Sequence, residues 1–340
     1  MSVVSGFESK KARNGMQNNK RSGQMKKRVL VTGGAGFIGS NMADELIRRG
    51  YKVTIIDSLV TGEKKNINPK ADFVKGDVRK ASDIEKCFSK KIDAIFHIAG
   101  CASTIKSFDD PAADLYTNVL GTINIINAAV KHRVPRLLYA SSMTSYGVPD
   151  GVPVKETMGT RPIAYYGITK YAGERYVLAS GLRQDTGFKL NTTAFRMFNV
   201  YGRRQSLTNP YQGVMSIFIG NVIRNEPVKI FGDGKQSRDF VHIRDVADAW
   251  IGALDNKASY GEVFNIGTGM RISVNKLVYT IIKMCGKDRK KYAVKYYSAR
   301  PGDQRHMQAD ISKAKKLLGW EPGVSFEDGV KDVIDWAKGS

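Results

Sequence analysis

The chain has 340 residues, of which 42% are hydrophobic and 25% are charged, as in a globular protein with one large domain or two coupled ones. No segment approaches the roughly 18 apolar residues of a membrane-spanning helix, and three scattered cysteines exclude a disulfide framework. With no apolar segment of that length and no disulfide framework, we expect a cytoplasmic protein with no membrane partner. The formal net charge of +22 comes without a zinc-finger or RNA-recognition signature, so we also expect no nucleic-acid partner.

The first 25 residues differ in composition from the rest of the chain. They are rich in Ser, Gly, Asn, Gln and Lys and contain few apolar side chains. Such a segment cannot bury enough surface to fold alone, so we expect a disordered basic tail at 1–25.

Buried strands and amphipathic helices alternate after this tail. Apolar runs predict strands at 29–31, 53–56, 73–74, 94–98, 137–140 and 192–195. Apolar residues at three- and four-residue spacings predict helices at about 37–49, 112–132 and 164–183. This alternation predicts an α/β protein whose doubly wound parallel sheet is covered by helices on both faces.

The last third of the chain has shorter elements and more loop signals. Its final part, 311–338, reads as two amphipathic helices around the Gly319–Pro322 turn. We expect this third to form a smaller α/β unit over the strand ends of the sheet.

A glycine-rich loop follows the first strand and opens the first helix. Gly33 permits a tight turn, Gly36 lets backbone amides approach a pyrophosphate, and Gly39 lets the helix pack on the strand. The free N–H groups of the first turn, at Phe37 and Ile38, favour an anion. The alternative is an ordinary glycine-rich turn, but the strand–loop–helix context favours a Rossmann-type dinucleotide site.

Two aspartates follow the next two strands. Asp57 ends the second strand, where a carboxylate bonds the adenosine ribose hydroxyls and repels a 2′-phosphate, which favours NAD over NADP. Asp77 could bond the adenine, although an ordinary turn aspartate is a competitive interpretation.

The candidate catalytic residues are a phenol, an ammonium and a hydroxyl. Tyr166 and Lys170 are four residues apart, hence on one face of the predicted helix 164–183. A nearby positive charge lowers the pKa of a phenol, so Tyr166 is predicted to act as a base. Ser142 ends the fifth strand, and ligands bind at the carboxyl ends of strands in such sheets.

These motifs together resemble the extended short-chain dehydrogenase/reductase family, and within it the nucleotide-sugar epimerases of the UDP-glucose 4-epimerase type. The likeness covers about residues 27–338. The segments that carry it are Thr32–Gly39, Asp57, Gly76–Val78, His97–Gly100, Ser141–Gly147, Tyr166–Lys170, Ala194–Gly202, Gly232–His242, Phe264–Gly267 and Arg300–Asp303.

The resemblance implies a division of the chain between two ligands. Residues 26–195 would form the NAD-binding domain, to which the chain returns at about 236–266. Residues 196–235 and 267–340 would bind the nucleotide sugar. Val78 and Ala99 would join the glycine loop, Asp57 and Asp77 around the cofactor.

Roles for individual residues also follow from the resemblance. Tyr166 would be the base, Lys170 would tune it and hold the nicotinamide ribose, and Ser142 would bond the reacting sugar oxygen. Asn199 would contact the nucleotide diphosphate. The diphosphate would be neutralised by Arg238 and Arg300, and the nucleotide ribose bonded by Asp303.

The position that gates the sugar 2-substituent in the epimerases falls at or next to Met307. A bulky aromatic there favours plain hexoses and a small residue admits N-acetylhexosamines, so methionine leaves both open.

Met143 and Thr144 stand where related 4,6-dehydratases carry an Asp-Glu pair, which argues against water elimination.

The implied activity is NAD-dependent 4-epimerisation of UDP-glucose and UDP-galactose by oxidation at C4 and re-reduction on the other face. The alternatives are the same reaction on UDP-N-acetylglucosamine, UDP-glucuronate or a dTDP-6-deoxyhexose, a one-way nucleotide-sugar reductase, and a non-catalytic NAD-binding protein.

A homodimer is implied, paired through the helices near 112–132 and 164–183. His97 and His242 lack partners at metal-ligand spacing and are expected to be structural, so we predict no metal.

Overall fold

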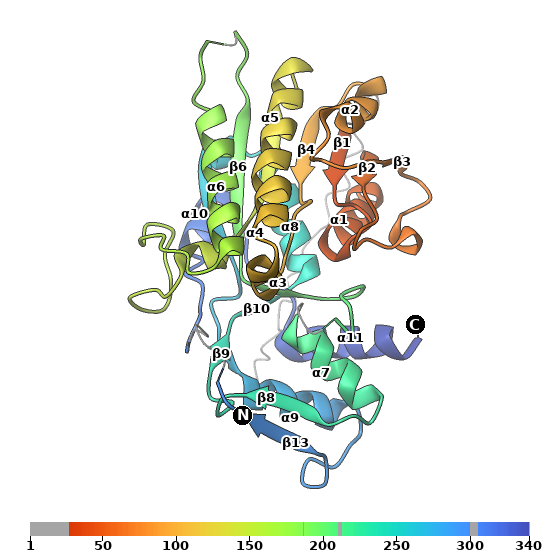
Figure 1. The fold of residues 1–340 in the computed structure, drawn as a ribbon, viewed down its shortest axis with the longest axis vertical. Coiled ribbons are helices and arrows are strands. Elements are labelled where there is room, and N and C mark those ends of the chain that lie inside the picture. Colours follow the sequence, from red (N-terminus) through yellow and green to blue (C-terminus); the bar gives the residue numbers. More distant parts are fainter. Residues whose placement is uncertain (1–26, 186, 210–212, 300–304, 340) are drawn as a thin grey trace, which may run out of the picture.

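The computed structural model describes residues 27–185, 187–209, 213–299 and 305–339. The tail predicted at 1–25, Arg300 and Asp303 therefore lie outside the described residues. Figure 1 shows a large sheet-and-helix part above a smaller part.

The large part is built on a seven-stranded sheet with the order β11-β6-β5-β4-β1-β2-β3. All its neighbouring strands pair in parallel. The strands are β1 (Arg28–Thr32), β2 (Lys52–Asp57), β3 (Asp72–Lys75), β4 (Ala94–His97), β5 (Arg136–Ser142), β6 (Asn191–Met197) and β11 (Glu262–Ile266). The predicted doubly wound parallel sheet is thus confirmed, with its strand order reversing between β1 and β4.

Helices cover both faces of this sheet because successive strand residues point to opposite sides. Val29 and Val31 pack into the core under α1 and α8, whereas Leu30 packs into the core under α5 and α6. The helices on the first face are α1 (Phe37–Arg48), α8 (Ile243–Ala253) and α10 (Ser312–Leu318). Those on and around the second are α2 (Ala81–Glu85), α3 (Thr104–Asp109), α4 (Pro111–Leu115), α5 (Gly121–Lys131) and α6 (Tyr165–Ser180).

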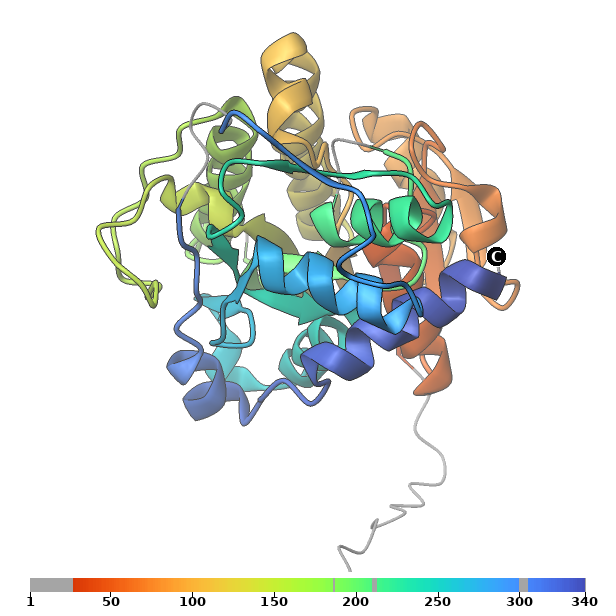
Figure 2. The same cartoon turned by 90° about the horizontal axis from the view of Figure 1, so that it is seen from below.

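The smaller part has its own apolar core, formed where α7, α9 and α11 pack against one another. Figure 2, seen from below, shows these three helices gathered on that side of the molecule. Its elements are α7 (Val214–Ile223), α9 (Val274–Met284) and α11 (Phe326–Gly339) with β8 (Val228–Phe231) and β13 (Val294–Tyr297). Short strands join it to the sheet: β7 (Asn199–Tyr201), β9 (Ser237–Arg238), β10 (Phe240–His242) and β12 (Ile272–Ser273).

The chain passes between the two parts repeatedly. It leaves the sheet after β6, returns for α8 and β11, and leaves again for α9. Residues 307–320, which the sequence analysis assigned to the sugar-binding unit, pack into the main core, and α10 lies against α8 and β11. The helix pair around Gly319–Pro322 is confirmed, but its two members belong to different cores.

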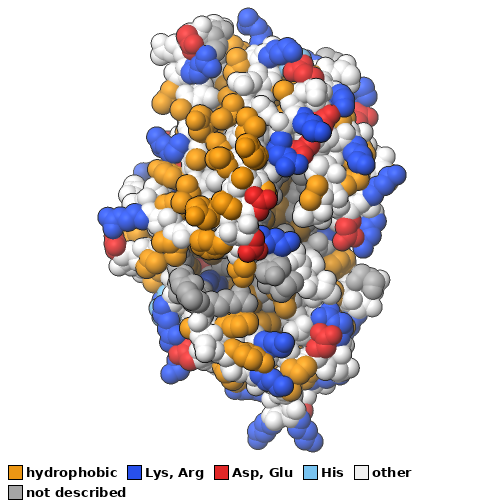
Figure 3. All heavy atoms as spheres, in the orientation of Figure 1, with side chains coloured by type: hydrophobic (Ala, Val, Ile, Leu, Met, Phe, Trp, Pro, Cys, Tyr) orange, Lys and Arg blue, Asp and Glu red, His pale blue; other side chains and the backbone are white. Residues whose placement is uncertain are grey.

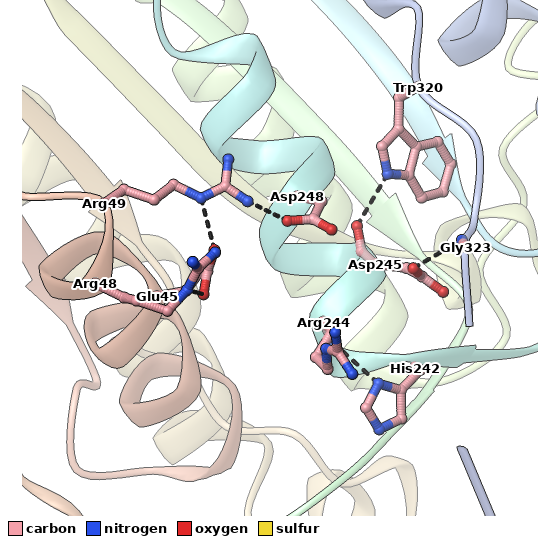
Figure 4. Close-up of polar contacts among 9 residues, drawn as sticks. All are labelled: Glu45, Arg48, Arg49, His242, Arg244, Asp245, Asp248, Trp320 and Gly323. Atoms are coloured by element: carbon pink, nitrogen blue, oxygen red, sulfur yellow. Dashed lines mark hydrogen bonds and ion pairs between the residues drawn. The ribbon is translucent and has the colours of Figure 1, made fainter. Parts of the chain in front are cut away.

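Polar contacts fix α8 to its neighbours (Figure 4). The Arg49 guanidinium pairs with Asp248, which joins the end of α1 to α8. On the other side of α8, the Trp320 indole donates to the carbonyl of Asp245 over 3.0 Å, and the Gly323 N–H donates to the Asp245 carboxylate over 2.9 Å. The linker between α10 and α11 is thereby held against the main part.

Candidate active site

The loop between β1 and α1 makes the tight turn that its glycines predict. Gly33 has a φ of +69°, which L side chains rarely adopt, and a Cβ there would lie 2.9 Å from the backbone of Ala99. A Cβ on Gly39 would overlap the carbonyl oxygen of Gly33. Glycine at both positions therefore lets β1, α1 and the residues after β4 approach one another.

The first turn of α1 is open to an anion. Its N-cap residue, Gly36, offers no side chain to the free N–H groups of the turn, and the turn contains no acidic residue. Phe37 and Ile38 begin the helix and pack partly against the main core. Unsatisfied backbone donors at a helix N-terminus fit a dinucleotide pyrophosphate.

Asp57 is held beside this loop by two backbone hydrogen bonds. Its carboxylate accepts from the N–H of Ala35 over 2.9 Å and from the N–H of Leu59 over 2.8 Å, and the side chain is buried. Each carboxylate oxygen keeps acceptor capacity. The carboxylate is thus fixed beside the glycine loop, and its contact with the ribose hydroxyls of NAD stays a prediction.

Asp77 and Val78 follow β3 with different surroundings. The Asp77 carboxylate accepts from the backbone and guanidinium of Arg79, and this guanidinium lowers the pKa of Asp77. Val78 is buried, and a Cβ on Gly121 would lie 2.8 Å from its side chain. The contact of Asp77 with adenine stays a prediction.

The structure brings Ser142, Tyr166 and Lys170 together. Ser142 ends β5 and Tyr166 stands at the start of α6, where the serine hydroxyl is close enough to lower the pKa of the phenol. The Ser142 hydroxyl also accepts from the N–H of Thr144 over 3.2 Å and bonds its hydroxyl over 2.9 Å. These contacts fix the serine rotamer at the carboxyl end of the sheet.

Lys170 lies one turn further along α6, with 4% of its surface exposed. Its ammonium is 4.4 Å from the ring centroid of Tyr139, a cation–π contact. Burial lowers the pKa of Lys170 to about 8, while the Asp114 carboxylate acts in the opposite direction. The lysine is therefore protonated at neutral pH, but it loses its proton at a lower pH than an exposed lysine would.

One electrostatic prediction is wrong. The spacing of Tyr166 and Lys170 predicts a lowered phenol pKa, but burial raises the pKa of Tyr166 to about 12, against the opposing effect of the Ser142 hydrogen bond. Residue spacing contains no measure of desolvation, which is the largest effect on the Tyr166 pKa here.

Sequence reasoning missed a buried polar cluster next to these residues. The Asp114 carboxylate accepts from the Thr169 hydroxyl over 2.8 Å and from the Asn118 amide over 3.2 Å. Asn118 lies in a single π-helical turn, Tyr116–Leu120, a local feature often found at functional sites. Asp114, Asn118 and Thr122 recur every four residues, so a polar stripe on the helix predicted at 112–132 was the available signal.

The expected nucleotide-sugar residues lie on other elements. Asn199 starts β7, and its side-chain oxygen is buried without a hydrogen-bond partner. A buried acceptor left unpaired is costly unless a ligand satisfies it. Arg238, in β9, is half-buried and donates to the carbonyl of Ser237 over 2.9 Å. Met307 has no exposed surface and belongs to the main core, so its role in sugar selection stays a prediction.

The two buried histidines bond groups of the protein itself, and a purely structural role for them stays a prediction. The His97 ring bonds the Thr32 hydroxyl over 2.8 Å and the Thr122 hydroxyl over 3.0 Å, and burial lowers its pKa to about 3. His242 accepts from the N–H of Arg244 and caps α8 (Figure 4). Within the described ranges, no group of three His, Cys, Asp or Glu side chains could hold a metal ion, and no helix is long and apolar enough to cross a membrane.

A doubly wound sheet with this glycine turn, Asp57, and a Ser142–Tyr166–Lys170 group defines an NAD-dependent enzyme of the extended short-chain dehydrogenase/reductase class. Residues 29–267 match the NAD dependent epimerase/dehydratase family, and the chain belongs to that family.

Several relatives share almost the full length of the chain. A putative UDP-glucose 4-epimerase of Methanocaldococcus jannaschii is 41% identical over 312 residues, which are 91% of this chain and 98% of the relative. The structure of the UDP-glucose 4-epimerase of Thermotoga maritima with UDP-glucose superposes with a TM-score of 0.86 at 37% identity, covering 92% and 99% of the two chains. A UDP-N-acetylglucosamine 4-epimerase of Methanobrevibacter ruminantium also reaches 0.86, at 32% identity over 93% and 99%.

Proposed function

We propose that the protein is a UDP-sugar 4-epimerase that interconverts UDP-glucose and UDP-galactose. The observation that carries this proposal is the group of Ser142, Tyr166 and Lys170, which the end of β5 and the first turns of α6 bring together at the carboxyl end of the sheet. Met143 and Thr144 follow Ser142 directly. Neither side chain can serve as the acid or base that eliminating water would need, which leaves oxidation and re-reduction of one carbon.

The side chains of this chain would handle the proton and hold the sugar. Tyr166 would take the proton of the C4 hydroxyl and later return it, while Ser142 would hold the same oxygen. Bound NAD would supply the hydride acceptor and donor. The Lys170 ammonium would favour the Tyr166 phenolate, which burial disfavours. The glycine turn and Asp57 would hold the cofactor throughout.

The remaining contacts would bind the nucleotide. We propose that residues 26–195 with 236–266 hold NAD, and that 196–235 and 267–340 hold the UDP-sugar. The unpaired oxygen of Asn199 supports a polar ligand at β7. Arg238, Arg300 and Asp303 complete the proposed diphosphate and ribose contacts. The similarity to a UDP-glucose 4-epimerase solved with UDP-glucose supports uracil as the base.

The test is an NMR assay of the purified full chain with UDP-glucose and no added cofactor. Appearance of the UDP-galactose anomeric proton would support both C4 epimerisation and a retained cofactor, and Tyr166→Phe should abolish it. No product, even after NAD is added, would overturn UDP-glucose as the substrate. UDP-N-acetylglucosamine, UDP-glucuronate and dTDP-sugars would then be tried in the same assay.

We infer that the protein pairs with a second copy of itself. Hydrophobic side chains gather on the face over α4 and α6 in Figure 3. Leu115 and Tyr116 are 49% and 52% exposed, and Ile168 and Tyr176 on α6 are similarly open. A contiguous apolar face of this kind is typical of an interface, and an isologous pair would cover it on both copies.

Light scattering after size-exclusion chromatography tests the dimer. The wild type should have twice the 37.6 kDa chain mass, and Leu115→Glu should shift it to the monomer mass. Val60→Glu is a matched control, because Val60 is also exposed but lies in the loop after β2. A monomeric wild type would contradict the proposal.

The cytoplasm is the proposed compartment. Cys87, Cys101 and Cys285 are all free, which suits a reducing environment. Localisation of a fluorescent fusion to any other compartment would contradict this.

A further inference from the structure

A buried carboxylate lies behind the catalytic lysine and has no part in the mechanism above. Asp114, on α4, has 3% of its surface exposed. Its oxygen Oδ2 accepts from the Thr169 hydroxyl over 2.8 Å and from the Asn118 amide over 3.2 Å. Thr169 is the residue before Lys170 on α6, so the carboxylate is joined to the backbone that presents the catalytic lysine.

The same cluster borders the lysine on its other side. A Cβ on Gly100 would lie 2.6 Å from Oδ1 of Asn118 and 3.5 Å from Nζ of Lys170. The Asn118 amide and the Lys170 ammonium are therefore neighbours. The Asn118 oxygen also accepts from the N–H of Cys101 over 2.9 Å, which orients the amide so that its nitrogen donates to Asp114.

The charged groups around Lys170 leave Asp114 as its available counter-charge. Glu174, one turn along α6, is held by Arg196 in a two-pronged ion pair at 2.9 Å and 2.7 Å. Burial raises the pKa of the Cys101 thiol and lowers that of His97 to about 3, so both are uncharged near neutral pH. Burial likewise keeps the Tyr139 phenol, under the ammonium, in its neutral form.

Asp114 also acts on the tyrosine. Its negative charge favours the Lys170 ammonium and disfavours a Tyr166 phenolate. Burial raises the pKa of Asp114 itself, while the hydrogen bonds from Thr169 and Asn118 and the Lys170 charge act in the opposite direction and favour the ionised carboxylate.

We propose that Asp114 is a positioning residue of the active site. Its buried carboxylate keeps Lys170 protonated at the place where this lysine would contact NAD, and it limits ionisation of the Tyr166 phenol. The part that concerns turnover rests on the proposed function. The part that concerns NAD rests only on Lys170 lying against the cofactor, so the two are tested separately.

The first measurement is the pH dependence of NAD⁺ affinity. Any retained cofactor is first removed, and NAD⁺ is then titrated into the full chain by calorimetry between pH 6 and pH 10, for the wild type and for Asp114→Asn. Affinity should fall as Lys170 loses its proton, and Asp114→Asn should move the midpoint of that fall to lower pH by about one unit. A merely structural role would weaken binding at every pH and leave the midpoint unchanged, which would overturn the proposal.

Two further variants keep this result interpretable. Asp109→Asn is the matched control, since Asp109 is an exposed carboxylate just before α4, and its midpoint should equal that of the wild type. Asp114→Glu keeps the charge and should restore most of the shift. If Asp114→Asn does not fold, Thr169→Val removes one donor to the carboxylate and should give a smaller shift in the same direction.

The second measurement is the pH profile of UDP-glucose epimerisation. Neutralising Asp114 should let Tyr166 ionise at lower pH, so both limbs of the profile should move down together. An unmoved profile would refute the effect on Tyr166. A wild type that turns over no UDP-sugar would instead refute the proposed function, while the NAD⁺ titration would still decide whether Asp114 supports Lys170.

Discussion

Glu174, beside the catalytic lysine, and Asn199, on the expected sugar side, differ in how their polar atoms are satisfied. Glu174 is fully buried, and both its oxygens accept hydrogen bonds, from Arg196 and from the Ser141 hydroxyl. Asn199 is half-buried, and its side-chain oxygen has no partner. The Glu174 carboxylate beside Lys170 is thus satisfied by the protein itself, whereas the Asn199 oxygen has no partner among the described residues and fits the predicted sugar contact.

Removing Arg196 should have the largest effect on stability. Arg196→Met leaves the Glu174 carboxylate buried without its cation, which costs about 3–5 kcal/mol. Urea unfolding followed by circular dichroism measures this. The double variant Arg196→Met/Glu174→Gln should recover most of the loss, and a single variant as stable as the wild type would show that the NAD side does not depend on this pair.

Removing the Ser142 hydroxyl should affect chemistry more than stability. Ser142→Ala removes the hydroxyl proposed to hold the reacting sugar oxygen, and kcat for UDP-glucose should fall roughly 100-fold. Ser141→Ala is the matched control, because the neighbouring hydroxyl bonds Glu174 over 2.6 Å. It should lose about 1 kcal/mol of unfolding free energy and keep its turnover. Equal effects of the two variants on kcat would contradict the assignment.

Substitution of Asn199 should show the opposite balance. Asn199→Ala removes a side-chain oxygen that has no partner, so the free energy of unfolding should be unchanged or slightly higher. The KM for the UDP-sugar should rise about tenfold, as expected for one lost hydrogen bond to a charged ligand. A loss of stability with an unchanged KM would make this residue structural and erase the contrast with Glu174.

The smallest effect is expected at the surface contact between α1 and α8. Asp248→Asn breaks its ion pair with Arg49, which keeps a second partner in Glu45 at 2.6 Å (Figure 4). Both members of the pair are partly exposed, so the cost should be below about 1 kcal/mol and should disappear at high salt. Urea unfolding at low and at high ionic strength measures it, and a salt-independent loss would show that packing matters there.

The sequence predicted features that depend on neighbours along the chain. The turn at Gly33, the strand-end position of Asp57 and the Tyr166–Lys170 spacing are local, and parallel pairing places the carboxyl ends of β1, β2 and β5 at one edge. Ser142 therefore lies at the carboxyl end of the sheet, near the start of α6 where Tyr166 stands.

Features that depend on distant segments could not be predicted in this way. Buried Arg136 bonds the carbonyls of Ala253 and Leu254 at the end of α8, more than 100 positions away. The position of Met307 could not be predicted for the same reason, because only the tertiary structure shows that its side chain packs into the main core. The raised pKa of Tyr166 likewise reflects burial, which no spacing of residues contains.

The repeated passage of the chain between its two parts has a mechanical consequence. Segments around β7, β10, β12 and the α10–α11 linker each join the sheet to the smaller part, so the joints are several and lie on different elements. A hinge motion needs connections that rotate about one common axis. Several connections on different elements do not share such an axis, so they oppose rotation of one part against the other. In an epimerase built this way, the sugar ring would make the half-turn between the two hydride transfers, while the two parts of the protein keep their spacing.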